Sequence, residues 1–128
     1  APVAKKGDRV VAVDTHVVLV STPNGTVPTP TPLPFDGALS GDLATSVVVE
    51  NQPAGVKGST AQNQTSHTAP GGTFQKPPSN KASVHQGSGT VLFENKPVAR
   101  LGDPAMTCND PQDTPSGSVI ASGKVLAG

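Results

Sequence analysis

The sequence predicts an all-β protein built from short β-hairpins and long ordered loops. Fourteen glycines and fourteen prolines among 128 residues interrupt the chain too often for long helices. The longest stretch without either residue, residues 8–22, holds six valines, and β-branched residues favour strands. Residues 47–59 and 91–103 share an apolar strand, a Glu-Asn-Gln/Lys-Pro segment, a second short strand and a glycine, a layout typical of a β-hairpin.

The N-terminus carries a partial third copy of this repeat. Gly7 and Asp8 match Gly102 and Asp103, and the valine-rich stretch follows them. A chain of 128 residues leaves no room for a second large core. We therefore expect one domain over residues 1–128.

Two segments between the predicted hairpins are expected to lie outside regular structure. Residues 23–34 hold five prolines, which favour extended or polyproline II backbone and a rigid spacer. A peptide ligand would normally present Pro-x-x-Pro, and this run has no such spacing. Residues 58–81 are rich in small polar residues, and so long a loop is unusual in a compact domain unless something anchors it.

Charge and composition exclude several classes of partner and compartment. Nine basic and nine acidic residues give a net charge of zero, so we expect no nucleic acid partner. No apolar run could span a bilayer, and no signal core follows Lys5 and Lys6, so we expect synthesis in the cytoplasm without a signal peptide. The single Cys108 cannot form an internal disulfide, which leaves metal or assembly to support a thin core.

Four side chains form a candidate tetrahedral zinc set: His16, His67, His85 and Cys108. Their long spacing is not that of a zinc finger. The repeat positions are more informative, because His16 and His67 each come nine residues after the glycine of a repeat, and Cys108 follows the third glycine by six. His85 has no such position. If it is not a ligand, water or an aspartate such as Asp14 could complete the set.

A structural zinc is favoured over a catalytic one. The only glutamates, Glu50 and Glu94, lie in the predicted hairpin turns, and a closed four-ligand site leaves no position for a reacting water. The chain also lacks a phosphate loop and a Gly-x-Ser-x-Gly elbow. We expect no enzymatic activity. A small zinc hydrolase with a partly open site, or a binding module that uses the proline-rich segment, remain as alternatives.

Residues 96–104, followed by Cys108, resemble the signature of PAAR-repeat proteins. Further motifs occur in the order of the PAAR-like branch: Gly7-Asp8-Arg9, the proline-rich run, residues 71–80, Gly87-Ser88 and residues 106–111. Val98 in place of alanine is a conservative departure. The signature itself consists of Pro97, Val98, Ala99, Arg100, Gly102 and Asp103.

The resemblance implies a small cone of hairpins with pseudo-threefold symmetry, stiffened by one structural zinc ion. Three histidines and one cysteine would hold the ion, and His16, His67 and Cys108 match the motif positions. Such proteins cap a trimeric β-helical spike in type VI secretion or in phage-tail-like extracellular particles, one copy per trimer. They help to pierce the target envelope.

From this likeness we expect a stand-alone tip that contacts the target membrane transiently, with any effector cargo carried separately. A base that docks on a spike should expose apolar edges able to pair with its strands. Four residues are the expected contributors: Val119, Ile120, Val125 and Leu126.

Overall fold

The computed structural model describes residues 1–128, and strands are its only regular secondary structure, which confirms the predicted all-β class. It has no helix that could span a membrane. The strands are β1 (Arg9–Thr22), β2 (Gly25–Gly41), β3 (Ala44–Val49), β4 (Gln52–Ala54), β5 (Thr60–Asn63), β6 (Gly72–Phe74), β7 (Lys81–Val84), β8 (Leu92–Phe93), β9 (Lys96–Pro97), β10 (Pro104–Thr107) and β11 (Thr114–Ile120).

The main sheet is antiparallel and closes on itself. Its strand order is β11-β10-β7-β5-β2-β1-β6, and β11 also pairs with β1, so six strands form a ring with β6 added outside it. Closure removes free strand edges and encloses a core. Its large side chains are Phe35, Leu39, Val10, Val84 and Val119, and alanines and Cys108 fill the rest. A core with so many small residues agrees with the thin core expected from composition.

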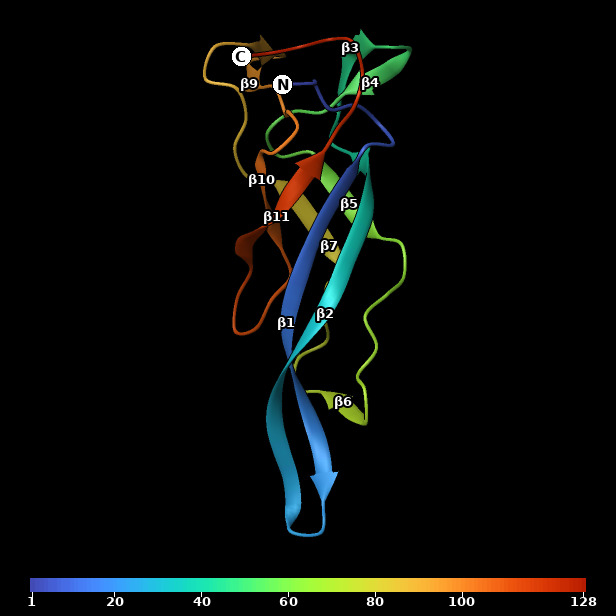
Figure 1. Cartoon of the computed structure of the whole chain (residues 1–128), viewed down its shortest axis with the longest axis vertical. Coiled ribbons are helices and arrows are strands. Elements are labelled where there is room, and N and C mark those ends of the chain that lie inside the picture. The colour runs from blue at the N-terminus through green and yellow to red at the C-terminus, as the bar shows by residue number, and fades with distance from the viewer.

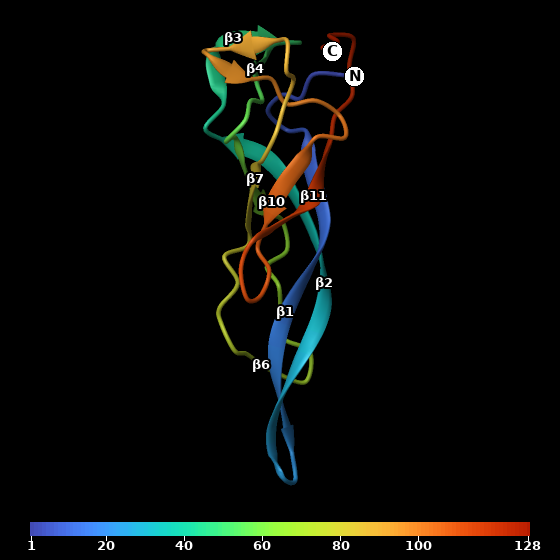
Figure 2. The ribbon, with the colours of Figure 1, turned by 90° about the vertical axis from the view of Figure 1, so that its left-hand side faces the viewer.

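The β1–β2 hairpin extends well beyond this closed sheet. Figure 1 shows it as the narrow lower end of the molecule, whereas both termini, β3, β4 and β9 lie at the wide upper end, and Figure 2 shows the same taper from the side. β1 pairs with β2 along its whole length, from Arg9 opposite Ala38 to Thr22 opposite Gly25. The valine-rich segment is therefore a strand, as predicted.

The prediction that residues 23–34 lie outside regular structure is wrong, because most of this segment is part of β2. Four prolines alternate along it, opposite Leu19, Val17, Thr15 and Val13. Alternate residues of an antiparallel strand direct their N–H groups to the same side, so prolines at every second position leave intact the donors that face β1. The missing N–H groups all belong to the outer edge. The prolines involved are Pro28, Pro30, Pro32 and Pro34.

Both predicted hairpins are present. β3 pairs with β4, and β8 pairs with β9. In each hairpin the Glu-Asn pair of the repeat forms the turn, with φ of 50° and 68° in the first and 54° and 64° in the second. Positive φ at both central residues is the geometry that joins two strands with the correct twist. These residues are Glu50, Asn51, Glu94 and Asn95.

The N-terminal repeat copy contains the same kind of turn as the other two copies. Gly7, Gly58 and Gly102 have φ of 93°, 91° and 89°. In each turn the residue after the glycine donates its N–H to a carbonyl three residues earlier, and its side chain accepts the N–H of that same earlier residue. The side-chain acceptors are Asp8, Ser59 and Asp103.

The three segments before these turns hydrogen-bond to one another in a closed cycle. Gly55 N–H donates to the Ala4 carbonyl at 2.8 Å, Ala99 N–H to the Gly55 carbonyl at 3.0 Å, and Ala4 N–H to the Ala99 carbonyl at 2.9 Å. Small residues are required here, since a Cβ on Gly55 would lie only 3.2 Å from that of Ala4. A second apolar cluster surrounds this cycle at the wide end: Val3, Ala44, Val49, Ala54, Val56, Val98 and Ala127.

Residues 58–81 are mostly loop, as predicted, but they also contribute β5 and β6 to the main sheet. β5 pairs with the end of β2, and β6 pairs with Val18–Val20 of β1. The loop between these strands is therefore fixed at both ends. His67 lies within it.

Candidate metal centre

Four buried side chains from three separate parts of the chain converge beside β1. Asp14 and His16 lie on β1, His67 in the loop between β5 and β6, and Cys108 directly after β10. One potential ligand atom from each residue lies within 4.8 Å of the others. The group is an oxygen, two nitrogens and a sulfur, and zinc accepts all three kinds of donor in tetrahedral sites.

β1 supplies two of the four because of the period of a strand. Residues two apart point to the same face, so Asp14 and His16 both face the interior. Their side chains are 0 % and 1 % exposed. The backbone N–H and carbonyl of the intervening Thr15 point away from β2 and bond to Asn109 and Asp110, which follow Cys108.

His67 is positioned by Asn80, the last residue of the 71–80 motif, for which the sequence predicts no role of its own. The Asn80 side-chain oxygen accepts the His67 backbone N–H at 2.9 Å and an amide N–H of Asn63 at 3.3 Å. His67 Nε2 then lies 2.9 Å from Asp14 Oδ2. The long polar segment is thus anchored at His67, as its length led us to expect.

Cys108 is positioned by the two residues that follow it. Asn109 Oδ1 accepts the Thr15 N–H at 2.7 Å, and Asp110 N–H donates to the Thr15 carbonyl at 2.8 Å. Asp110 Oδ2 also accepts the Val17 N–H at 2.8 Å. These bonds use the edge of β1 that points away from β2 and place Cys108 next to His16.

A bound cation would change the protonation of the group. Burial raises the pKa of the Cys108 thiol to about 11, and the Asp14 carboxylate acts in the same direction. In the metal-free chain the thiol therefore keeps its proton, and Sγ lies 3.3 Å from Asp14 Oδ2. A bound cation reverses this preference, because it stabilises the thiolate directly.

Three buried polar atoms of the group have no hydrogen-bond partner: Asp14 Oδ1 and both ring nitrogens of His16. Leaving such atoms unpaired in a folded interior costs about 1–3 kcal/mol each. A metal ion would satisfy the donors that face it. The residues present therefore fit a metal ion by both chemistry and unmet bonding capacity.

Two of the three phenylalanines of the chain pack against the histidines. The His16 ring centroid lies 5.8 Å from that of Phe74 and 5.1 Å from that of His67, and the Phe35 ring lies 6.3 Å from His67. Apolar rings limit the access of water and strengthen electrostatic interactions inside the group.

Three of the four predicted ligands meet here, and His85 does not. Its backbone N–H donates to the Pro104 carbonyl, at the start of β10, whereas Cys108 follows the end of that strand. Four residues of strand separate the two positions by roughly 13 Å. Asp14, the aspartate named above as a substitute, occupies the fourth place. The signal for it was its separation by two from His16 on a predicted strand.

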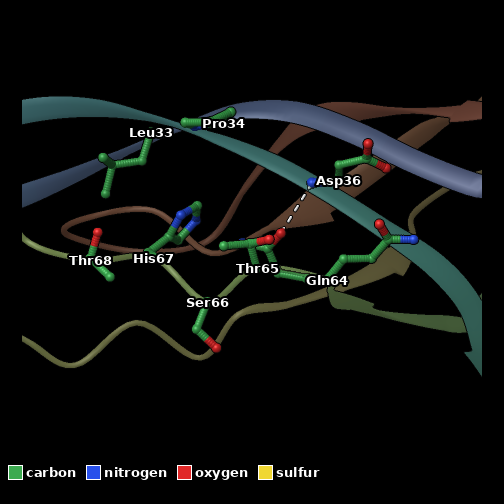
Figure 3. A pocket seen from close by; sticks show the side chains of 9 residues that line it. Leu33, Pro34, Asp36, Gln64, Thr65, Ser66, His67 and Thr68 are labelled. Carbon is green, nitrogen blue, oxygen red and sulfur yellow. Dashed lines mark hydrogen bonds between the residues drawn. The ribbon is translucent and has the colours of Figure 1, made fainter.

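Two pockets adjoin the four candidate ligands. A cavity of about 60 Å³ is lined by His16, Cys108, Asp110, Asp113 and Lys76, among others. An open pocket of about 290 Å³ lies beside His67, between β2 and residues 63–68. Figure 3 shows its polar lining and the hydrogen bond from the Asp36 N–H to Asn63. Asp36, its one acidic group, is paired with Arg9.

The signature residues lie at the wide end and shape it. Val98 and Ala99 are fully buried, and the Arg100 guanidinium binds the Asp103 carboxylate at 2.8 Å across the third turn. Of the four residues expected at a partner surface, Val119 is fully buried in the sheet core and unavailable to a partner. The others are exposed: Ile120, Val125 and Leu126.

No family model matches the chain, and no curated protein matches it either.

Proposed function

We propose that this chain is the structural tip of a trimeric β-helical spike in a contractile injection system, stiffened by one zinc ion. The observation that carries this proposal is the closed cycle of hydrogen bonds through Ala4, Gly55 and Ala99. The resemblance of residues 96–104 to the PAAR signature points in the same direction.

The cycle supports a pseudo-threefold arrangement of a single chain. Three isolated β-bridges join the same three segments to one another: Val3 with Arg100, Lys5 with Ala54, and Val56 with Val98. In each bridge the end of one segment meets the start of the next, so the three segments enclose a triangle. A monomer that sits on the axis of a trimer has to offer three similar surfaces. A buried layer built from three similar segments supports such an arrangement of the surface around it.

The wide end supports a role as the docking face. Val48 of β3 is 61 % exposed, Leu92 of β8 57 % and Leu126 67 %. These elements gather around both termini at one end of the molecule (Figure 1). Several large apolar side chains exposed at one end of a molecule are typical of a protein interface.

The narrow end supports a role as the point. The metal centre lies where the β1–β2 hairpin leaves the closed sheet, and it ties β1, the His67 loop and the Cys108 segment together. A structural zinc contributes about 10 kcal/mol or more to folding, which a core rich in alanine needs. The outer edge of the hairpin has few free N–H groups, so it offers no template for another strand.

A structural ion is favoured over a catalytic one. Glu94 accepts the Ser46 N–H at 3.0 Å, and Glu50 accepts the Lys124 N–H at 2.6 Å. Both glutamates therefore belong to the wide end, and neither adjoins the metal centre.

Co-expression with the trimeric spike protein of the same injection system tests this proposal. Native mass spectrometry should find one copy of the chain per trimer. The double variant Val48→Asp with Leu126→Asp should lose the complex, because charges would replace the apolar face. Val27→Asp, at a site 48 % exposed on the opposite end, is the matched control and should keep it. Failure of the wild-type chain to bind, or loss of binding only in the control, would overturn the proposal.

A zinc hydrolase with a partly open site is the second candidate, favoured by the cavity beside His16 and Cys108. It predicts zinc-dependent cleavage of small ester or peptide substrates that Asp113→Asn and Asp110→Asn reduce. The spike-tip proposal predicts no turnover with or without zinc.

A further inference from the structure

Asp110 stands out among the groups near the metal centre because it is nearly buried, charged and not itself a member of the ligand group. Its side chain is 7 % exposed, and its Oδ2 lies 3.6 Å from Nδ1 of His16. We propose that Asp110 is a positioning residue, which accepts the Nδ1 proton of His16 and so directs Nε2 to the metal. This inference rests on the metal centre of the proposed function.

The position of Asp110 is fixed from three directions. Its N–H donates to the Thr15 carbonyl and its Oδ2 accepts the Val17 N–H, both at 2.8 Å, so it brackets His16 on either side along β1. The preceding Asn109 binds the Thr15 N–H. A carboxylate held by this network needs no large movement to reach the imidazole.

His16 needs such a partner. Both of its ring nitrogens are buried, and neither has a hydrogen bond in the metal-free chain. A neutral imidazole carries one proton, and only the nitrogen without it can bind a metal ion. Because Nδ1 faces Asp110, a proton there has an acceptor, and Nε2 remains for the ion. Phe74 packs on the ring and limits its rotation.

A carboxylate behind a metal-bound histidine fixes the tautomer and increases the basicity of the ligand. Loss of such a partner typically reduces metal affinity 10- to 100-fold. Asp110 differs in this respect from Asp14. Asp14 offers an oxygen to the ion itself, whereas Asp110 acts through His16.

Zinc affinity of the full chain, measured by competition with a chromophoric chelator, tests the proposal. Asp110→Asn keeps an oxygen for the Val17 N–H but removes the charge that faces His16, and should weaken zinc binding about 10- to 100-fold. Asp113→Asn is the matched control. Asp113 is exposed and lines the same cavity, so the same loss of charge there should leave affinity within about 2-fold of wild type.

Two further readouts separate positioning from general stability. Long-range ¹⁵N–¹H correlation spectra of the zinc form should show His16 protonated at Nδ1 and bound to metal through Nε2. The metal-free Asp110→Asn and wild-type chains should unfold at the same temperature. Three results would overturn the role of Asp110 but leave the metal centre standing: His16 bound through Nδ1, an unchanged zinc affinity of Asp110→Asn, or a loss of stability in the metal-free variant as large as in its zinc form. A wild-type chain that binds no zinc would overturn the metal centre together with it.

Discussion

Asp14 Oδ2 lies 2.9 Å from Nε2 of His67, although 53 residues separate the two in the chain. The same oxygen accepts the Cys108 thiol at 3.3 Å. One carboxylate on β1 therefore connects the two loops that meet it. In a metal-bound chain it would act as the oxygen donor of the set, and the loops would be held by the ion.

Asp14 and His85 give opposite expectations for the fourth ligand. Asp14→Ala should weaken zinc binding by more than about 100-fold, because it removes a donor and not just an outer partner. His85→Ala should leave zinc affinity unchanged, since His85 lies at the far end of the β7–β10 pair. Chelator competition with both variants measures this. Zinc binding that depends on His85 and not on Asp14 would contradict the ligand set.

The three equivalent turns predict three similar costs. Gly7→Ala, Gly58→Ala and Gly102→Ala each place a methyl group in open space but force a side chain into positive φ. Each should reduce the free energy of unfolding by about 1–2 kcal/mol. Gly89→Ala also meets open space without positive φ, and should change it by less than about 1 kcal/mol. Chemical denaturation of the four variants measures these changes in the free energy of unfolding. Clearly unequal losses at the three turns would contradict their equivalence.

The alternation of prolines in β2 predicts that their position matters more than their number. Thr29 lies between Pro28 and Pro30 and faces Val18 of β1, which is fully buried. Thr29→Pro should remove a hydrogen bond to β1 and destabilise the chain by about 1–3 kcal/mol.

The reverse change tests the outer edge. The triple variant Pro28→Thr, Pro30→Thr and Pro32→Thr restores three N–H groups that point outward, so it should keep the fold but associate through edge pairing. Light scattering after size-exclusion chromatography measures the association. A triple variant that unfolds, or that stays monomeric at high concentration, would count against this explanation of the prolines.

The sequence alone could predict the elements whose signals are local. Residues 8–22 form a strand because valines dominate them, and Glu50-Asn51 forms a turn in which Asn51 is a residue type that tolerates positive φ. Residues 23–34 were expected outside regular structure because their prolines favour extended or polyproline II backbone, and proline also has no N–H to donate to a sheet. Only the partner strand decides whether that N–H was needed, and the register with β1 is a tertiary property.

The candidate site divides in the same way. The repeat positions identified His16, His67 and Cys108, which the structure brings together. The repeat positions could not decide whether His85 is a ligand. The antiparallel pairing of β7 with β10 puts His85 at the opposite end of the pair from Cys108, and this pairing is a tertiary property. Asn80, Asn109 and Asp110 act through hydrogen bonds to backbone distant in the chain. Residues 71–80 and 106–111 contain them, but these motifs do not reveal bonds that form only in the folded chain.

Zinc content and native mass of the untagged chain, purified without added metal, test the central claim most directly. We predict one zinc ion per chain, retained in the native mass spectrum, with a large fall in unfolding temperature when a chelator removes it. A chain that carries no metal, binds none when zinc is supplied, and unfolds at the same temperature with and without chelator would contradict the account.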